Sequence, residues 1–385
     1  MNIIRKYSMS AALALACTFG SVAAEAQTLK ISHQWAAETD ARDRAVRVFV
    51  DAVKEQAPDL DFRIYPGRSL VQDPIAQLDA MQNGTLEMAV YPLVYGVGKV
   101  PAFSITILPG LIRSFDQAVA LKGSAYHERL QEIAHENGIH IVTWWWTPGG
   151  FATKETPIGE PSTVNGLAMR ASDPYFEQML QSAGASVHAM PSSEVYTGLQ
   201  TGVLDGLLTS SETFVSMRIY EQTNHATVGG PNEIFLLLQP LVMSKASWDA
   251  LTPEQQAAFE AAATKSEEFF NGVQTEASQT MVEEFTKAGA EVRQLSDEEY
   301  AAWVDLAQST AWESFRQNIP NGEELIAVVQ DSLAATSGGA AEPAATEPAV
   351  TEAPPADAAA PADPAAQPAD AAAQPAGEEA QPAAQ

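Results

Sequence analysis

The chain has 385 residues and a formal net charge of −28, with 21 Lys and Arg against 49 Asp and Glu. A chain of this length forms two or three units of domain size and buries a sizeable core. The strong negative charge argues against proteins that bind nucleic acid or anionic membranes through a basic surface, and it favours solubility.

The N-terminal residues have the pattern of a removed secretion signal. Arg5 and Lys6 precede an apolar stretch over 9–24, and Ala24-Glu25-Ala26 has the small-x-small form of a cleavage site. A buried amphipathic helix is the alternative, but the uniformly apolar run argues against it. We therefore expect a periplasmic protein that is secreted through an N-terminal signal peptide over 1–26.

The single cysteine, Cys17, lies within that apolar stretch, so the mature chain would form no disulfide. A lipid anchor at Cys17 is the alternative, although Ala14-Leu15-Ala16 matches a lipoprotein cleavage box only loosely. Beyond the signal, the most apolar stretch, 234–243, is interrupted by Gln239 and Pro240. It is far short of the ~20 residues that a membrane helix needs, so we expect no direct membrane insertion.

Strand-like and helix-like segments alternate between Gln27 and Leu333. Residues 29–33 and 61–65 have the pattern of short strands, and 43–55 carries apolar residues at helical spacing. This alternation is typical of an α/β layered fold.

A long helical stretch over about 253–288 follows a short strand over 241–244. Thr252 is a plausible N-cap of this helix, and Pro253 suits its first turn. One helix of this length would extend ~50 Å, which is longer than a small lobe, so it could span two lobes.

A helix that ends at a glycine and is followed by an apolar strand occurs twice. The first unit covers 76–91 and the second covers 193–208, with Gly84 and Gly202 at the helix ends. Glycine takes the left-handed conformation that stops a helix, and the apolar strands suit a buried place in a sheet. The repeat predicts two similar lobes, with a chance match over four residues as the alternative.

The composition changes at about Ala334, where a segment of Ala, Pro, Gln and acidic residues begins and continues to Gln385. Such a segment lacks the apolar residues that a core requires, so we expect a disordered Ala/Pro/acidic tail over 334–385. It serves as a solvated linker, a spacer or an interaction arm.

The sequence contains no pattern that supports catalysis or a cofactor. The six histidines have no metal-ligand spacing, and Ser210-Ser211 lacks the flanking glycines of a nucleophile elbow. Gly96-Val97-Gly98 lacks the third glycine of a dinucleotide fingerprint. The abundant carboxylates single out no acid/base pair, so we expect no enzyme, no metal ion and no cofactor.

Two segments, Val164–Arg170 and Ser186–Gly206, resemble the signature of TRAP (tripartite ATP-independent periplasmic) transporter solute-binding proteins. The second contains the run Glu194-Val195-Tyr196-Thr197-Gly198-Leu199-Gln200-Thr201-Gly202-Val203-Leu204-Asp205-Gly206. Tyr65-Pro66-Gly67 and the 241–245 strand agree in order, and the similarity runs from about residue 29 to about residue 327.

The resemblance implies an α/β, two-lobed periplasmic binding protein fold with a ligand cleft between the lobes and a long helix spanning both. Closure about a hinge would enclose the ligand. The first lobe is then expected to comprise 27–150 plus about 238–285, and the second 151–237 plus about 286–333.

The resemblance also implies a protein that captures a small organic acid and delivers it to the membrane subunits of a TRAP-type transporter. In that family, the arginine two residues after a Gly-Leu-x sequence binds the ligand carboxylate, and here this residue is Arg170. A planar guanidinium matches two carboxylate oxygens and stays charged in a dry cleft. A surface arginine paired with an acidic residue is the alternative.

Two departures from the family pattern bear on the ligand. Phe151 lies where many relatives carry a second arginine, and the chain lacks the polar run that often follows Asp205-Gly206 in relatives. Polar contacts there would come from Thr209, Ser210 or Ser211, or be missing. These changes fit a monocarboxylate with an apolar or aromatic body better than a dicarboxylate.

Aromatic residues near the expected cleft are further candidates. Trp146, on the strand-like run 143–151, is placed either to stack on the ligand or to pack in the core. Tyr91 and Tyr95 follow the strand of the first repeated unit and either line the cleft or pack beside it. The expected ligand contacts are Arg170, Trp146, Phe151, Tyr91, Tyr95, Ser192, Thr209 and Ser210.

Other functions share some of these features. A ligand-sensing receptor module for a membrane sensor would use the same cleft, and neighbouring genes for a small and a large membrane subunit would favour transport instead. A secreted hydrolase would need a nucleophile or metal spacing that the sequence lacks. An ATP-driven permease is a less favoured partner, because the Glu194–Gly206 run is similar to the TRAP family.

Overall fold

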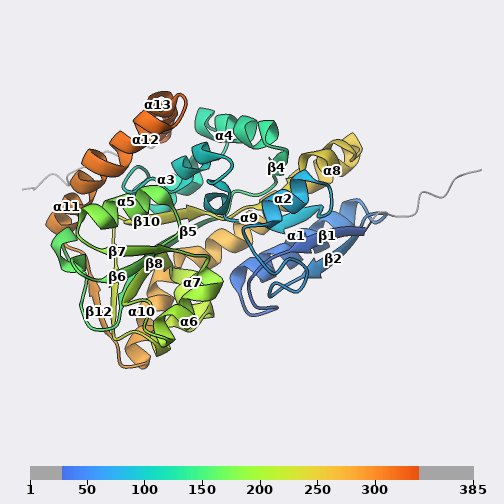
Figure 1. Cartoon of the computed structure of the whole chain (residues 1–385). Helices are drawn as coiled ribbons and strands as arrows, with labels where there is room; N and C mark the ends of the chain where they lie inside the picture. The colour runs from blue at the N-terminus through green and yellow to red at the C-terminus, as the bar shows by residue number, and fades with distance from the viewer. Residues whose placement is uncertain (1–27, 338–385) are drawn as a thin grey trace, which may run out of the picture. The chain divides into compact units, whose positions relative to one another are not determined.

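The computed structural model of the chain describes residues 28–337 (Figure 1). The expected signal peptide, the lipid-anchor alternative at Cys17 and nearly all of the expected tail lie outside these residues. Helix α13 (Gly322–Ser337) continues beyond Leu333, so the helical chain ends later than the change of composition suggested. Within 28–337, the helices are all too short or too polar to cross a membrane.

The first sheet combines parallel and antiparallel strands. Its strands are β1 (Thr28–Ser32), β2 (Asp61–Tyr65), β3 (Met88–Val90), β4 (Ile139–Ile141) and β11 (Leu241–Ser244). They lie in the order β2-β1-β3-β11-β4, with β1 parallel to β2 and β3, and β11 antiparallel to β3 and β4. The strands predicted over 29–33, 61–65 and 241–244 are present in this sheet, as is the strand of the first repeated unit.

Helix α1 (Ala41–Gln56) packs against the first sheet through the apolar residues that the sequence placed at helical spacing. It begins at the N-cap Asp40, whose side chain accepts a hydrogen bond from the backbone N–H of Arg42. The ring of Phe49 meets the ring of Phe259 with centroids 5.2 Å apart. Phe259 belongs to α9 (Pro253–Thr275) and also meets the ring of Phe62 on β2, with centroids 6.0 Å apart, so both helices pack against this sheet.

The second sheet has seven strands within the described residues. They are β5 (Trp146–Thr153), β6 (Ala168–Ala171), β7 (Ser186–Ala189), β8 (Gly206–Ser210), β9 (His225–Val228), β10 (Phe235–Leu238) and β12 (Glu291–Gln294). Their order is β12-β9-β5-β8-β6-β7, with β10 paired to β5. Strand β6 is parallel to β7 and β8, and β5 is antiparallel to β8, β9 and β10. Because β5 begins at Trp146, this sheet starts before the expected boundary at 150.

The helical stretch expected over 253–288 is two helices, not one. Helix α9 begins with a capping box between Thr252 and Gln255 and ends at Thr275, and α10 (Ala277–Lys287) follows after Glu276. Helix α9 packs on α1, whereas α10 packs on α7 (Ser211–Ser216) and on strands of the second sheet. The pair together spans both sheets, as Figure 1 shows.

The repeated unit is present at both expected places. Helix α2 (Gln77–Gln82) is followed by Gly84 at φ 70°, and α6 (Val195–Gln200) is followed by Gly202 at φ 77°. These left-handed glycines end the helices and turn the chain toward β3 and β8. Both strands start a few residues later than their apolar patterns suggested.

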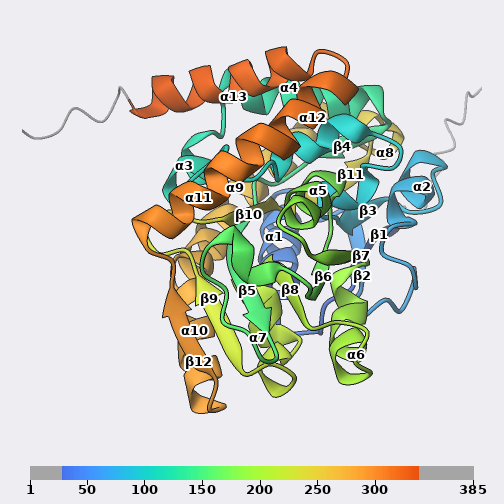
Figure 2. The same cartoon turned by 60° about the vertical axis from the view of Figure 1, so that its left-hand side comes forward.

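The last helices of the described chain extend across both sheets. Helix α11 (Asp297–Ala307) and the π-helical turn Gln308–Trp312 pack on α5 (Pro174–Ser182), and α12 (Glu313–Asn318) joins them to α13. Helix α13 packs on α4 (Ala125–Glu136) and α3 (Phe115–Ala120), as Figure 2 shows. Because α4 leads directly into β4, α13 lies against an element connected to the first sheet.

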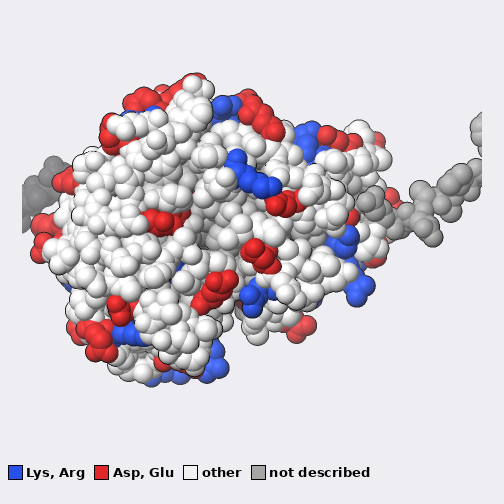
Figure 3. Space-filling model, viewed as in Figure 1, with Lys and Arg blue, Asp and Glu red and all other residues white. Residues whose placement is uncertain are grey.

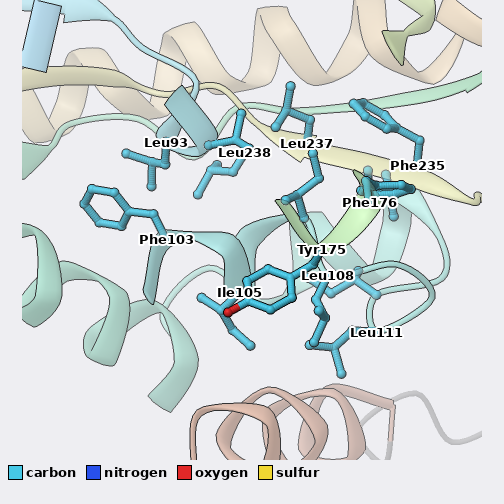
Figure 4. Packing of buried hydrophobic residues seen from close by; sticks show 14 of the residues in the cluster. Leu93, Phe103, Ile105, Leu108, Leu111, Tyr175, Phe176, Phe235, Leu237 and Leu238 are labelled. Atoms are coloured by element: carbon cyan, nitrogen blue, oxygen red, sulfur yellow. The ribbon is translucent and has the colours of Figure 1, made fainter. Parts of the chain in front are cut away.

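A cluster of buried apolar side chains joins these elements. Figure 4 shows Phe103 and Ile105 of the 3-10 turn Pro101–Thr106 facing Tyr175 of α5 and Leu238 of β10. Because the cluster draws on loops of the first sheet, on α5 and on β10, the two sheets share one continuous apolar core.

Candidate ligand site

The candidate site lies where parallel strands of both sheets end. Strand β6 carries Arg170, and the loops after β7 and β3 carry Ser192 and Tyr95. Gln34 follows the end of β1 by two residues. Ligands in open α/β sheets bind beyond the carboxyl ends of the strands, and here two such edges face each other.

Arg170 is 2% exposed and only part of its hydrogen-bonding capacity is used. Its Nε donates to the carbonyl oxygen of Met190 at 3.0 Å, and its Nη1 donates to the carbonyl oxygen of Leu208 at 2.9 Å. These two bonds orient the guanidinium against the ends of β7 and β8. A guanidinium has five N–H donors, so three are left for other partners.

Tyr95 connects the first sheet to the Arg170 region. Its hydroxyl oxygen accepts hydrogen bonds from the backbone N–H of Ser192 at 3.0 Å and from Nε2 of Gln34 at 3.1 Å. It also lies 3.2 Å from Oγ of Ser192, and the Arg170 guanidinium lies near it. The structure therefore brings three of the expected residues, Arg170, Tyr95 and Ser192, into one polar cluster.

The Arg170 guanidinium forms no ion pair with any carboxylate of residues 28–337. Burial lowers the pKa of Arg170 from its ordinary value, and Tyr95 and Glu177 oppose that effect. An arginine nevertheless stays protonated in proteins because its ordinary pKa is so high. The site thus holds a buried positive charge that lacks a direct counter-ion among the described residues.

Asp173, three residues after Arg170, serves another purpose. Its Oδ1 accepts from the backbone N–H groups of Tyr175 and Phe176, which caps α5, and its Oδ2 accepts from Oγ of Ser104 at 2.5 Å. Burial raises the pKa of Asp173 to about 6, and these hydrogen bonds oppose the rise. The carboxyl group is therefore committed to the helix end and not to Arg170.

Tyr91 lies beside Tyr95, as expected for a residue after β3. The two rings meet edge to face with centroids 6.2 Å apart, and the Tyr91 hydroxyl donates to the carbonyl oxygen of Ile75 at 3.4 Å. Burial raises the pKa of Tyr91 well above its ordinary value. Tyr91 is therefore fully buried and packs against the ring of Tyr95.

Trp146 and Phe151 lie in the core and do not join the polar cluster. The Phe151 ring packs on the ring of Trp303 with centroids 5.2 Å apart, and Trp146 packs against Trp144 at 5.6 Å. Trp146 also lines a small apolar void with residues such as Ile105. Trp146 and Phe151 are five positions apart on β5 and face opposite sides of the sheet, and both are in the core because every residue of β5 is buried.

Thr209 and Ser210 end β8 at the same edge as Arg170. Thr209 is buried and lies opposite Gly150 of β5. Ser210 caps α7: its Oγ accepts from the backbone N–H of Thr213 at 3.4 Å and donates to the Thr213 hydroxyl at 2.8 Å. The Ser210 hydroxyl is therefore already engaged in the helix cap.

Gln34 was not singled out by the sequence analysis, yet it contacts Tyr95 directly. Its side chain is buried, with 6% of the residue exposed. The signal that could have found it is its place just after β1, because residues beyond the ends of parallel strands face the cleft in this fold class.

A second buried arginine, Arg42, forms a complete ion pair beside the site. Its Nε and Nη2 donate to the two carboxylate oxygens of Asp40 at 2.8 and 2.7 Å, and its Nη1 reaches Oγ1 of Thr213 and Oε1 of Gln239 at 3.0 and 3.1 Å. These bonds connect the start of α1 to α7 and to the chain between β10 and β11. The charge of Arg42, unlike that of Arg170, is neutralised in place.

The outer face seen in Figure 3 mixes acidic and basic side chains without a continuous basic patch. Across the described ranges, no cluster of three or more His, Cys, Asp or Glu side chains has the arrangement of a metal site. The chemistry that the buried residues offer is therefore the binding of an anion by a guanidinium, supported by hydroxyl and amide groups from both sheets.

Residues 31–318 match the model of the bacterial extracellular solute-binding protein family 7, DctP. The chain belongs to this family. The resemblance to TRAP transporter solute-binding proteins, which rested on the segments around Arg170 and Glu194–Gly206, is thereby confirmed, and so is the two-lobed α/β fold.

Two curated relatives in this family match most of the chain. A solute-binding protein of Albidiferax ferrireducens is 34% identical over 331 residues, which cover 85% of this chain and 98% of the relative. The C4-dicarboxylate-binding periplasmic protein DctP of Rhodobacter capsulatus is 27% identical, with 84% of this chain and 96% of the relative covered.

A solved structure of the family has the same fold. The crystal structure of a TRAP periplasmic solute-binding protein from Rhodoferax ferrireducens, with bound malonate, superimposes with a TM-score of 0.77. It is 35% identical, and the match covers 80% of this chain and 98% of that chain.

Proposed function

We propose that this protein captures a small organic acid and delivers it to the membrane subunits of a TRAP-type transporter. The observation that carries the proposal is the buried guanidinium of Arg170, which has donors to spare and no carboxylate partner among residues 28–337. A buried charge without a partner is costly, and a carboxylate ligand would supply the counter-charge through two parallel hydrogen bonds.

The relatives support a carboxylate as the ligand class. The protein of Rhodobacter capsulatus is named for binding C4-dicarboxylates, and the structure from Rhodoferax ferrireducens contains malonate. The receptor-module alternative would use the same cleft, but no relative reported above supports it. We therefore propose transport, with export to the periplasm directed by residues 1–26.

The ligand that we propose carries one carboxylate. Arg170 and Arg42 are the buried arginines in the described part of the chain, and Arg42 is already paired with Asp40. Phe151, at the position of a second arginine in many relatives, packs on Trp303 instead. One available guanidinium favours a monocarboxylate, whose remaining body would be apolar or aromatic.

A thermal-shift screen of organic acids on the mature chain tests this proposal. A ligand that binds only the folded state raises the melting temperature, so the effective acids identify the ligand class. Arg170→Ala should abolish the shift, because removing one partner of a buried charge pair costs about 2–5 kcal/mol of binding energy, or about 30- to 4,000-fold in affinity.

The matched control is Arg293→Ala. Arg293 lies on β12 of the same sheet but pairs with Glu299 at 2.7 Å and is partly exposed. We expect this variant to keep the full shift. If no carboxylate stabilises the wild type, or if Arg170→Ala responds like the wild type, the proposed function is wrong.

A further inference from the structure

The side-chain amide of Gln34 is only half satisfied. Its Nε2 donates to the Tyr95 hydroxyl at 3.1 Å, whereas its Oε1 is buried and has no hydrogen-bond partner within residues 28–337. A buried acceptor without a partner is unfavourable, because folding has removed the water that it would otherwise bind. Such an atom at the edge of a candidate site requires an explanation.

The unpaired oxygen lies close to the Arg170 cluster. The two terminal atoms of an amide are roughly 2.2 Å apart, so Oε1 of Gln34 lies within about 5.5 Å of the Tyr95 hydroxyl oxygen. That hydroxyl is hydrogen-bonded to Ser192 and lies near the Arg170 guanidinium. A small ligand whose carboxylate meets Arg170 would therefore extend toward Oε1 of Gln34.

In this orientation of the amide, Tyr95 does not satisfy this oxygen. Its hydroxyl accepts from the Ser192 N–H and from Nε2 of Gln34, and its own proton has Oγ of Ser192 as a near acceptor at 3.2 Å. A donor for Oε1 would then come from a bound molecule. On the ligand, a hydroxyl close to the carboxylate would meet this requirement.

We propose that Gln34 determines ligand specificity, by accepting a hydrogen bond from a hydroxyl on carbon 2 or 3 of the bound acid. The ligand class is then the hydroxy-monocarboxylates, a narrowing that rests on the proposed function of the same site. A site built to hydrogen-bond a substrate hydroxyl discriminates strongly against the analogue without it, because the buried acceptor then stays unpaired.

The test compares acids that differ only at that position. Lactate, propionate and pyruvate form one set, and mandelate, phenylacetate and phenylglyoxylate form a larger aromatic set. Their dissociation constants for the mature chain are measured by isothermal titration calorimetry, with both enantiomers of each hydroxy acid. We expect at least one hydroxy acid to bind at least about tenfold more tightly than its deoxy and oxo partners.

Gln34→Met keeps the length of the side chain and removes the acceptor, so this preference should fall to about one. Gln131→Met is the matched control, because Gln131 lies on α4 and makes its contacts with His140 and Ile141. We expect Gln131→Met to keep the wild-type preference. If Gln34→Met fails to fold, the wild-type ratios still decide the question.

The possible results separate the two proposals. Equal affinity for a hydroxy acid and its deoxy partner, tighter binding of the oxo acid, or an unchanged preference in Gln34→Met would overturn the role of Gln34 while leaving the carboxylate site intact. Failure of these six acids and of the wider panel to bind the wild type at all would instead contradict the proposed function.

Discussion

Replacing Tyr95 with Phe would remove one oxygen atom and leave the ring in its contact with Tyr91. That oxygen is hydrogen-bonded to the N–H of Ser192 and to Nε2 of Gln34, lies 3.2 Å from Oγ of Ser192, and lies near Arg170. Tyr95 and Gln34 follow strands of the first sheet, whereas Ser192 and Arg170 belong to the second. The oxygen therefore links the two halves of the site, and its loss should act on the closed, ligand-bound form.

The size of the effect follows from the bonds that are lost. A neutral hydrogen bond contributes about 0.5–1.5 kcal/mol net. Losing the two hydrogen bonds of the Tyr95 hydroxyl with Ser192 should therefore cost about 1–3 kcal/mol of binding energy. That cost corresponds to a weakening of ligand affinity by about 5-fold to 150-fold.

Isothermal titration calorimetry with the acid that gives the largest thermal shift would measure this change. Tyr126→Phe is the matched control, because the Tyr126 ring is buried away from the site and its hydroxyl has no partner among the described residues. We expect its affinity to equal that of the wild type. An affinity of Tyr95→Phe within twofold of the wild type would refute the reasoning that this oxygen holds the lobes together around the ligand.

Two further predictions concern the stability of the fold. Burial raises the pKa of Glu233 to about 8, so the folded state holds a proton there that the unfolded state releases above pH 4.5. The unfolding free energy should therefore fall by about 1.4 kcal/mol per pH unit as the pH rises from 5 toward 8, and Glu233→Gln should remove this contribution. Urea denaturation at several pH values measures it, and the same pH dependence in the variant and the wild type would contradict the raised pKa of Glu233. Asp40→Asn leaves the Arg42 charge buried without its counter-ion and should cost about 3–5 kcal/mol of unfolding free energy. Glu299→Gln, which breaks the partly exposed pair with Arg293, should cost about 1 kcal/mol or less, and equal costs for the two variants would show that burial does not matter here.

Arg170 could be predicted from the sequence because a long family motif fixes both its strand and its place on that strand. The short strands and α1 could be predicted because each buries one face, so their apolar residues repeat with the period of the element. Gly84 and Gly202 were also informative, since few other residues adopt the left-handed conformation that ends a helix.

Other features depend on contacts between distant segments. The break at Glu276 has neither proline nor glycine to mark it, and it coincides with the change from packing on α1 to packing on α7. Gln34 meets Tyr95 across 61 positions of the chain, so no local pattern connects them. Trp146 and Phe151 remain predicted ligand contacts, with core packing as the alternative for Trp146, and both rings lie in the buried apolar cluster.

The Arg42–Asp40 pair restricts how the lobes can separate. It is fully buried, and it contacts Thr213 of the second lobe and Gln239 of the connecting chain. Pulling these groups apart would leave charged and polar atoms unpaired in a dry environment, which is more costly than parting the single hydroxyl of Tyr95 from Ser192. If the lobes open as the resemblance implies, these contacts favour a pivot near Arg42, with the ligand entering on the side of Tyr95.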